Sequence, residues 1–374
     1  MSRNYKLINV GSHVNPPPQM WVDYAPPGYR ENAPRLSTKQ FPDGEYEIMV
    51  VEGVEHRMLA QQLGLPREPT FARHFTDGYL AGRDPKARLE AMDQDNVDAD
   101  ILIHPGFPEM LPKDRKIRYG MMYAFNSWLG EFCAYAPDRL IGIGEIPLWD
   151  TEMAVAEAKR VHDLGLHGVL IPAVPGYYGA WSCPADHPYT SPFYEPIWQA
   201  LEDYNLVMVL HADAAAATPG LSTYSAPGVG GVSLIINKTL PAEAIASMIV
   251  GKVFQNHPKL KLVCSETGVG WMAHLVSWMS VLQREQPSSY AHLTEPMSDT
   301  FHKHVFGSFL WETCGVLNKE LIGVDNMMWC NDYPHSYGPW PNSHAQIDKD
   351  LKGLNAEERH KILAGNAVRV FNLA

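Results

Sequence analysis

Several histidine and carboxylate side chains follow short apolar runs of the sequence. Imidazole nitrogens and carboxylate oxygens are ligands that divalent metal ions accept. If the apolar runs are parallel strands of a barrel, the residues that follow them gather at one end of it. Ligating imidazoles also pass their other N–H to outer partners. The sequence therefore predicts a metal site with candidate ligands His13, His104, His211, Glu266 and Asp332, surrounded by Asp213 and His335.

Each candidate ligand also has a purely structural interpretation. A histidine at a strand end is more often a satisfied, partly buried side chain than a ligand, and this applies above all to His104. Asp332 precedes Tyr-Pro and could cap a turn. Glu266 precedes Thr-Gly and could be a first-turn carboxylate of a helix. The prediction of a metal site therefore rests on the joint occurrence of these residues directly after several of the apolar runs.

The elements that would position these residues alternate between apolar runs and amphipathic segments. Short apolar runs are typical of buried strands, and apolar residues at helical spacing are typical of helices. The predicted strands are Lys6–Val10, Ala99–Ile103, Leu140–Ile146, His167–Ile171, Leu206–Leu210, Lys261–Ser265, Val305–Phe309 and Met327–Cys330. The predicted helices are Pro85–Asn96, Lys113–Ala136, Thr151–Leu164, Pro192–Tyr204, Pro241–Gln255, Gly270–Arg284 and Lys319–Ile322.

Eight strands that alternate with helices predict an α/β fold in which the parallel sheet closes into a (β/α)8 TIM barrel. We expect residues 1–374 to form this single domain. Between the first strand and the first helix, Pro16–Thr76 is rich in proline, glycine and charge. We predict that this segment is an insertion that lies over the barrel mouth as a lid.

Composition limits the class of protein. The chain has 374 residues, of which 45% are hydrophobic and 19% charged, a balance typical of a globular protein. Its formal charge of −12 excludes a basic nucleic-acid-binding chain. Five cysteines without close pairs and no apolar run long enough to span a bilayer predict a soluble, cytoplasmic protein without a membrane partner. We expect its partner to be a small-molecule substrate.

The sequence resembles the amidohydrolase 2 family, the group that is similar to aminocarboxymuconate-semialdehyde decarboxylase. The resemblance covers the first strand and the chain from Arg83 to Leu373. It is carried by Arg88–Asp93, Pro137–Leu140, Glu266–Trp271, Asn331–His335, Trp340–Ser343 and Gly365–Ala367. The resemblance implies an amidohydrolase-superfamily barrel with a divalent metal at its mouth, zinc first, with manganese or iron as alternatives.

The resemblance also assigns roles to individual residues. His211 corresponds to the metal ligand after the fifth strand, and His13 to the second histidine of the first-strand motif. Asp332 corresponds to the carboxylate after the eighth strand, which binds the metal and transfers a proton. We therefore expect His13, His211 and Asp332 to hold the metal, with Glu266 or His104 as a fourth ligand or general base. The resemblance supports Asp332 as catalytic, and Glu266, to which the family pattern gives no role, is a second catalytic candidate.

Three positions depart from the family pattern. Gly11 stands where most relatives have a first ligand, and Asn9 stands where many have aspartate. Thr267 stands where the decarboxylases carry a catalytic histidine. Three protein ligands and a water still complete a tetrahedral zinc site. We therefore predict a mononuclear centre with at most one tightly bound metal ion per chain.

Two functions from different classes follow from these observations. The first is a metal-dependent hydrolase or lyase that hydrolyses or decarboxylates a small carboxylated or cyclic substrate. Arg73, Arg83 and Arg88 could bind a carboxylate, but each is better interpreted as a solvated charge. The second is a ligand-depleted subunit of a hetero-oligomer whose paralogous chain carries the main site. The chain is faintly similar to the accessory-subunit family of 2-aminoisobutyrate hydroxylase, an oxygen-dependent enzyme. A homo-oligomer is the alternative assembly.

Overall fold

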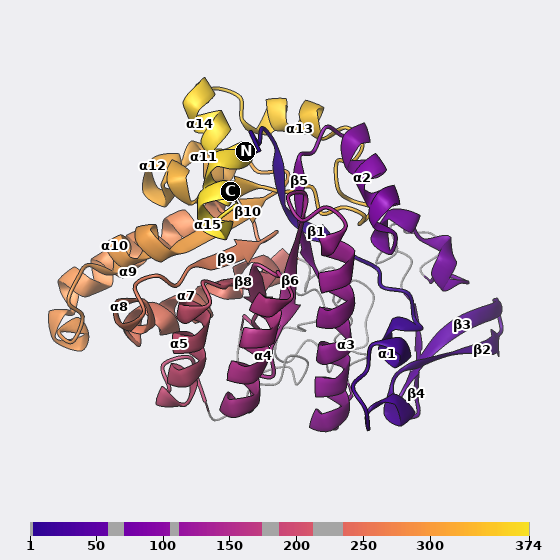
Figure 1. The fold of residues 1–374 in the computed structure, drawn as a ribbon. Coiled ribbons are helices and arrows are strands. Elements are labelled where there is room, and N and C mark those ends of the chain that lie inside the picture. Colours follow the sequence, from indigo (N-terminus) through magenta and orange to yellow (C-terminus); the bar gives the residue numbers. More distant parts are fainter. Residues whose placement is uncertain (1–2, 59–70, 105–111, 174–186, 212–234, 374) are drawn as a thin grey trace.

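The computed structural model describes residues 3–58, 71–104, 112–173, 187–211 and 235–373. Eight parallel strands form one sheet, and each of these strands pairs with the one of the eight that comes next in the sequence (Figure 1). Each strand overlaps one predicted apolar run, so the prediction of a TIM barrel is confirmed. The first strand extends to His13, beyond the predicted Lys6–Val10. The strands are β1 (Ile8–His13), β5 (Ala99–Ile103), β6 (Leu140–Glu145), β7 (Gly168–Leu170), β8 (Val207–His211), β9 (Leu262–Ser265), β10 (Val305–Phe309) and β11 (Met327–Trp329).

The first and last strands of this sheet meet through backbone hydrogen bonds just beyond β11. His13 N donates to Tyr333 O at 2.7 Å, and Asp332 N donates to Gly11 O at 3.1 Å. These bonds join the two ends of the sheet at the level where His13 and Asp332 project. Two of the predicted ligands therefore lie at the seam of the barrel, where its first and last strands meet.

Helices surround the strands (Figure 1). Aspartates Asp84, Asp114 and Asp150 cap the first three of the surrounding helices by accepting hydrogen bonds from first-turn N–H groups. Among the described residues, no helix has both the length and the apolar character needed to cross a membrane. The helices that the sequence predicts are found as α2 (Pro85–Gln94), α3 (Arg115–Ala134), α4 (Thr151–Asp163), α5 (Glu195–Asp203), α7 (Pro241–Val250), α8 (Val253–Asn256), α9 (Gly270–Glu285) and α12 (Lys319–Ile322), and those it does not predict are α10 (Met297–His304), α11 (Cys314–Leu317), α13 (Ser343–Asp350), α14 (Ala356–His360) and α15 (Asn366–Phe371).

The barrel interior is filled by strand residues and by the C-terminal helix. Ile8 and Val10 of β1 belong to one apolar cluster with Val370 and Phe371 of α15. Phe371 O also lies 3.0 Å from Nδ1 of His167, the residue before β7. Because α15 packs at the amino ends of the strands, the opposite, carboxyl end is the one available for a site.

The segment 16–76 contains secondary structure that the sequence analysis does not predict. It holds the short helix α1 (Met20–Asp23) and an antiparallel sheet of β2 (Arg35–Phe41), β3 (Gly44–Val51) and β4 (Val54–Arg57). Asp114 N, at the start of α3, donates to Glu52 Oε1 at 3.1 Å, so this sheet lies beside α3 (Figure 1). A role as a lid stays a prediction.

Candidate metal centre

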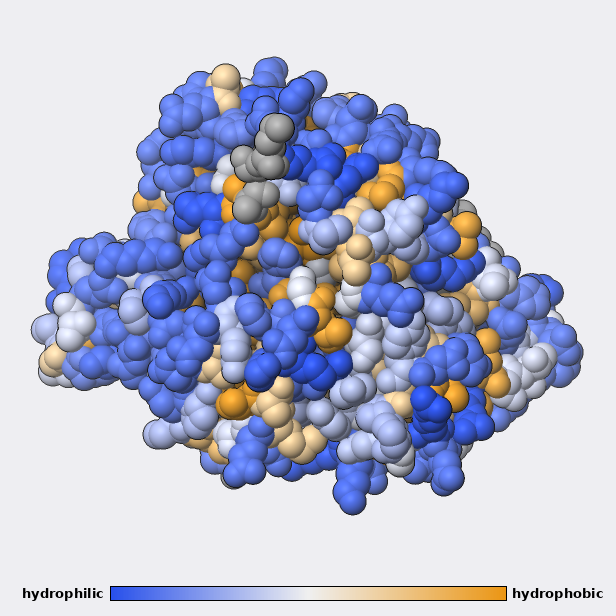
Figure 2. All heavy atoms as spheres, viewed as in Figure 1, coloured by the Kyte–Doolittle hydropathy of each residue, from blue (hydrophilic) through white to orange (hydrophobic). Residues whose placement is uncertain are grey.

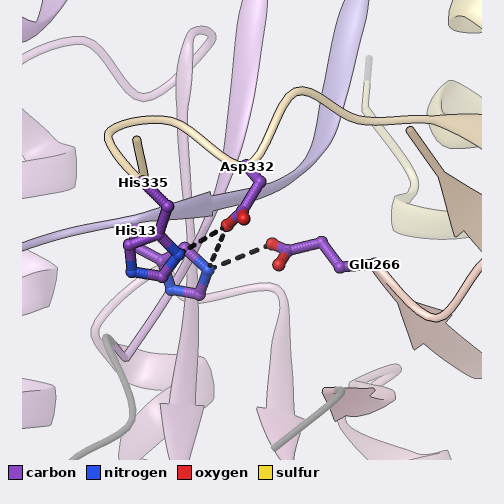
Figure 3. A group of neighbouring side chains, drawn as sticks. All are labelled: His13, Glu266, Asp332 and His335. Atoms are coloured by element: carbon purple, nitrogen blue, oxygen red, sulfur yellow. Dashed lines mark hydrogen bonds and ion pairs between the residues drawn. The ribbon is translucent and has the colours of Figure 1, made fainter. Parts of the chain in front are cut away.

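Four side chains converge at the carboxyl end of the barrel: His13, Glu266, Asp332 and His335 (Figure 3). One nitrogen or oxygen atom from each lies within 4.8 Å of those from the other three. His13 Nε2 is 3.1 Å from Glu266 Oε1 and 3.0 Å from Asp332 Oδ1. His335 Nδ1 is 2.8 Å from the same Asp332 oxygen. Two imidazoles and two carboxylates at this spacing suit a divalent metal ion.

His211, the last residue of β8, lies beside this group. Its Nε2 is 3.0 Å from Glu266 Oε2, and the centroid of its ring is 4.9 Å from that of His13. Glu266 therefore bridges a histidine of β1 and a histidine of β8. His335, which the sequence analysis assigns to the surroundings, lies in the group itself, with its ring stacked on His13 at 4.2 Å.

The ends of the strands direct these side chains into the mouth. β1 continues to His13, and Gly11 forms a bulge in its pairing with β5. Glu266 directly follows β9, and Asp332 follows β11 after Cys330 and Asn331. Both residues have left-handed backbones, with φ of +59° and +56°. This conformation costs a residue with a side chain about 1–2 kcal/mol. Such local strain is concentrated at functional sites.

Burial makes the charges of this group depend on one another. His13, Glu266 and Asp332 are fully buried. Burial alone would keep His13 neutral, but Glu266 and Asp332 raise its pKa to about 10. Burial opposes the charge of Glu266, yet His13 and His211 hold its pKa well below its usual range. Burial and Glu266 oppose the charge of Asp332, yet His335 and His13 keep its pKa low.

Several buried polar atoms of the group lack a hydrogen-bond partner in the part of the chain that the structure describes. They are His13 Nε2, Glu266 Oε1, Asp332 Oδ2 and His335 Nε2. His13 Nε2 is joined to both carboxylates by ion pairs. Buried polar atoms are nearly always satisfied, so facing atoms that are not satisfied indicate a missing ligand. A divalent cation would bond these atoms and replace the positive charge of His13, so the residues fit a metal ion.

The remaining predicted site residues have different positions. His104 O lies 3.2 Å from His13 Nδ1, and His104 Nδ1 lies 3.8 Å from Glu145 Oε1. Burial first, and then His13 and His211, lower the pKa of His104 to about 3. His104 is not part of the group of four, and its role as a ligand stays a prediction. Asp213 lies outside the described residues.

Two charged residues beside the site are buried, which the sequence analysis does not predict. Glu145 ends β6, and a carboxylate inside the apolar run Leu140–Ile146 was the signal for it. Arg88 is fully buried, which makes its interpretation as a solvated charge wrong. Its Nε donates to Asp100 Oδ2 at 2.7 Å, and its Nη1 donates to His13 O at 2.8 Å. Helix α2 thus turns this charge toward the barrel rather than toward solvent.

Comparison with known proteins gives consistent results. Residues 12–373 match the model of a protein family described as amidohydrolase. Gamma-resorcylate decarboxylase of Rhizobium radiobacter is 26% identical over 295 residues, which are 76% of this chain and 86% of that protein.

Two solved structures show the same fold. An amidohydrolase from Mycobacterium avium subsp. paratuberculosis matches with a TM-score of 0.80 and 20% identity, over 99% of this chain and all of that one. The 5-carboxyvanillate decarboxylase of Novosphingobium aromaticivorans, in complex with manganese and 4-hydroxy-3-methoxy-5-nitrobenzoic acid, matches with a TM-score of 0.61 and 20% identity, over 78% of this chain and 82% of that one. Since the family model matches nearly the whole sequence, the chain belongs to the amidohydrolase family.

Proposed function

We propose that the protein is a metal-dependent decarboxylase that acts on a small hydroxylated aromatic carboxylate. The observation that carries this proposal is the convergence of His13, Glu266 and Asp332. All three are buried, and each has a polar atom without a hydrogen-bond partner among the described residues. The similarity to gamma-resorcylate decarboxylase favours decarboxylation over hydrolysis. The comparisons do not support the two-subunit alternative.

One divalent ion would be held by His13, Glu266 and Asp332, with His335 and His211 beside them. Zinc is the first expectation from the sequence, and manganese or iron are alternatives, of which manganese occurs in the decarboxylase from Novosphingobium. When bound, the ion would hold the oxygen atoms of the substrate and withdraw electron density from it. The two carboxylates of the site balance its charge.

Asp332 is the group that moves the proton. The low pKa of Asp332, which His335 and His13 maintain against burial and Glu266, keeps it ionised before the substrate binds. It accepts the proton of the substrate's hydroxyl group and returns it to the ring carbon that bears the carboxylate. The bond from that carbon to the carboxylate then breaks, its electron pair returns to the ring, and carbon dioxide leaves. The product's hydroxyl group regains a proton from solvent.

The test is carbon dioxide release from 2,6-dihydroxybenzoate and from 5-carboxyvanillate by the purified chain with added Mn²⁺ or Zn²⁺. We expect release, and we expect Asp332→Asn to lower kcat by about 10²-fold or more, because the amide cannot accept a proton. Asp163→Asn, an exposed pair with Lys159, is the matched control and should keep the wild-type rate.

Three outcomes would contradict the proposal. An unchanged rate in Asp332→Asn would remove Asp332 from the proton transfer. Hydrolysis of an amide or lactone without carbon dioxide release would favour the hydrolase. Activity that appears only when a second, paralogous chain is added would favour the two-subunit enzyme.

A further inference from the structure

Gly11 lies inside β1, two residues before His13, and its missing side chain leaves space inside the site. A Cβ atom at position 11 would lie 2.7 Å from both Glu266 Cγ and Glu266 Oε1, and 2.9 Å from Ser265 Oγ. Contacts below 3.0 Å do not occur with real Cβ atoms, so something would have to move. The side chain that fills the space beside Gly11 is therefore that of Glu266.

Glu266 cannot retreat easily from this space. Its N–H donates to Ser308 Oγ at 2.9 Å, and its carbonyl oxygen accepts from Lys238 Nζ at 2.5 Å. These bonds hold its left-handed backbone just beyond the end of β9. One of the close atoms is Cγ, which is near the main chain, so relieving this contact would also move the carboxylate that Cγ carries.

From this place the Glu266 carboxylate reaches two histidines at once. Its Oε1 is 3.1 Å from His13 Nε2 and its Oε2 is 3.0 Å from His211 Nε2. A side chain at position 11 would push the carboxylate out of this bridging position. Glycine at this position is thus a condition for the geometry of the group.

We propose that Gly11 is a positioning residue: it lets Glu266, which follows β9, place a metal-binding carboxylate where a side chain on β1 would otherwise stand. This inference rests on the metal site of the proposed function. The oxygens of an aspartate lie two bonds beyond its Cβ, comparable to the 2.7 Å between a Cβ at position 11 and Glu266 Oε1. The same carboxylate position can therefore be supplied from either strand.

The first test measures Mn²⁺ affinity of the metal-free protein by electron paramagnetic resonance, without any substrate. Glu266→Ala removes the carboxylate and Gly11→Ala displaces it. We expect each to weaken Mn²⁺ binding by at least about tenfold, since even partners of metal ligands affect affinity by 10–100-fold. The double variant should bind no more weakly than Glu266→Ala, because both changes remove the same contact.

Gly44→Ala is the matched control for backbone strain. Gly44 has φ of +142°, close to the +145° of Gly11, but a Cβ there would meet only the movable guanidinium end of Arg73. It lies in β3, so we expect its Mn²⁺ affinity to equal that of the wild type. Equal losses in Gly44→Ala and Gly11→Ala would overturn the proposal, because strain alone would then explain both.

The second test moves the carboxylate to β1. Gly11→Asp combined with Glu266→Ala should regain Mn²⁺ affinity over Glu266→Ala alone, whereas Gly11→Asn with Glu266→Ala should not, because the amide has the shape without the charge. No gain with aspartate would overturn the proposal. If variants at position 11 fail to fold, Glu266→Asp keeps the test open: its shorter side chain should fail to bridge both histidines, and wild-type affinity would overturn the proposal.

The results separate this inference from the proposed function. A wild-type chain that binds Mn²⁺ and shows the expected losses, yet releases no carbon dioxide, would overturn only the decarboxylase. A chain that releases carbon dioxide while Glu266→Ala keeps full Mn²⁺ affinity would overturn only the role of Gly11 and Glu266.

Discussion

Glu145 is a buried carboxyl group close to the site, and burial raises its pKa to about 8. In the unfolded chain the same group titrates near 4.5. Between these two pH values the unfolded chain loses the proton while the folded protein keeps it. The stability of the folded protein should therefore fall as pH rises through this window, with a slope that approaches about 1.4 kcal/mol per pH unit.

Glu145→Gln should remove this pH dependence of stability, because glutamine has the same shape without a titrating group. Thermal unfolding of the metal-free protein at pH 4 and pH 8 measures the pH dependence. We expect the variant to match the wild type at pH 4 and to be more stable than the wild type at pH 8. Glu152→Gln, an exposed position on α4, controls for the loss of a negative charge. The same pH dependence in wild type and Glu145→Gln would contradict the prediction.

At the scale of single residues, the sequence was sufficient where a residue follows an apolar run. The convergence of His13, Glu266 and Asp332 could be predicted because the ends of parallel strands meet at one face. The place of His335 in the group could not, because it depends on the turn after β11 that brings Nδ1 to 2.8 Å from Asp332. Neither could the space beside Gly11, which only the position of β9 reveals.

Helix α2 is attached to the barrel by the buried charge of Arg88. Its guanidinium donates to Asp100 on β5, to His13 O and to Ser12 Oγ on β1. Removing one partner of a buried ion pair leaves the other charge without compensation, which costs about 3–5 kcal/mol. We predict that Arg88→Met lowers the free energy of unfolding, measured in urea, by about this amount.

The double variant Arg88→Met with Asp100→Asn distinguishes lost packing from a lost ion pair. It should be more stable than Arg88→Met alone, because no unpaired carboxylate then remains. Arg359→Met, which breaks an exposed pair with Asp348, should change stability little. If the double variant is as unstable as Arg88→Met, the carboxylate of Asp100 is not the cause.

At the scale of elements, the sequence predicts the strands and the capped helices but not the sheet of β2, β3 and β4. β2 exposes nearly all of its residues, so it lacks the alternation of apolar and polar residues that identifies a half-buried strand. Pro42-Asp43 between β2 and β3, followed by Gly44, was the available signal, since these residue types are typical of turns. The folding of this segment depends on pairing with β3, which a local pattern does not reveal.

At the scale of the whole molecule, a surface view shows mainly hydrophilic residues over the helices, with scattered apolar ones (Figure 2). Most of the apolar residues lie in the interior, inside the barrel and between the barrel and its helices. That division follows from the alternation of strands and helices, which is why the barrel could be predicted from the sequence. The joining of β1 to β11 could not, because it rests on hydrogen bonds just beyond the end of β11.

A metal ion at the site would join β1, β9 and β11 across this seam. We predict one equivalent of tightly bound divalent metal per chain, because β1 contributes His13 but Gly11 provides no second ligand. Elemental analysis of the purified protein tests the number, and two equivalents per chain would contradict it.

Metal binding should also stabilise the whole fold, because the ligands lie together only in the folded protein. A ligand that binds only the folded state at 100 times its Kd adds about 2.7 kcal/mol. Thermal unfolding with and without a chelator should therefore show a lower Tm without metal, and hydrogen exchange should show its largest increase at the amides of His13 and Asp332, whose bonds close the seam. In Asp332→Asn the chelator should have little effect on Tm. A chelator effect of wild-type size in that variant would mean that the stabilising metal binds elsewhere on the chain.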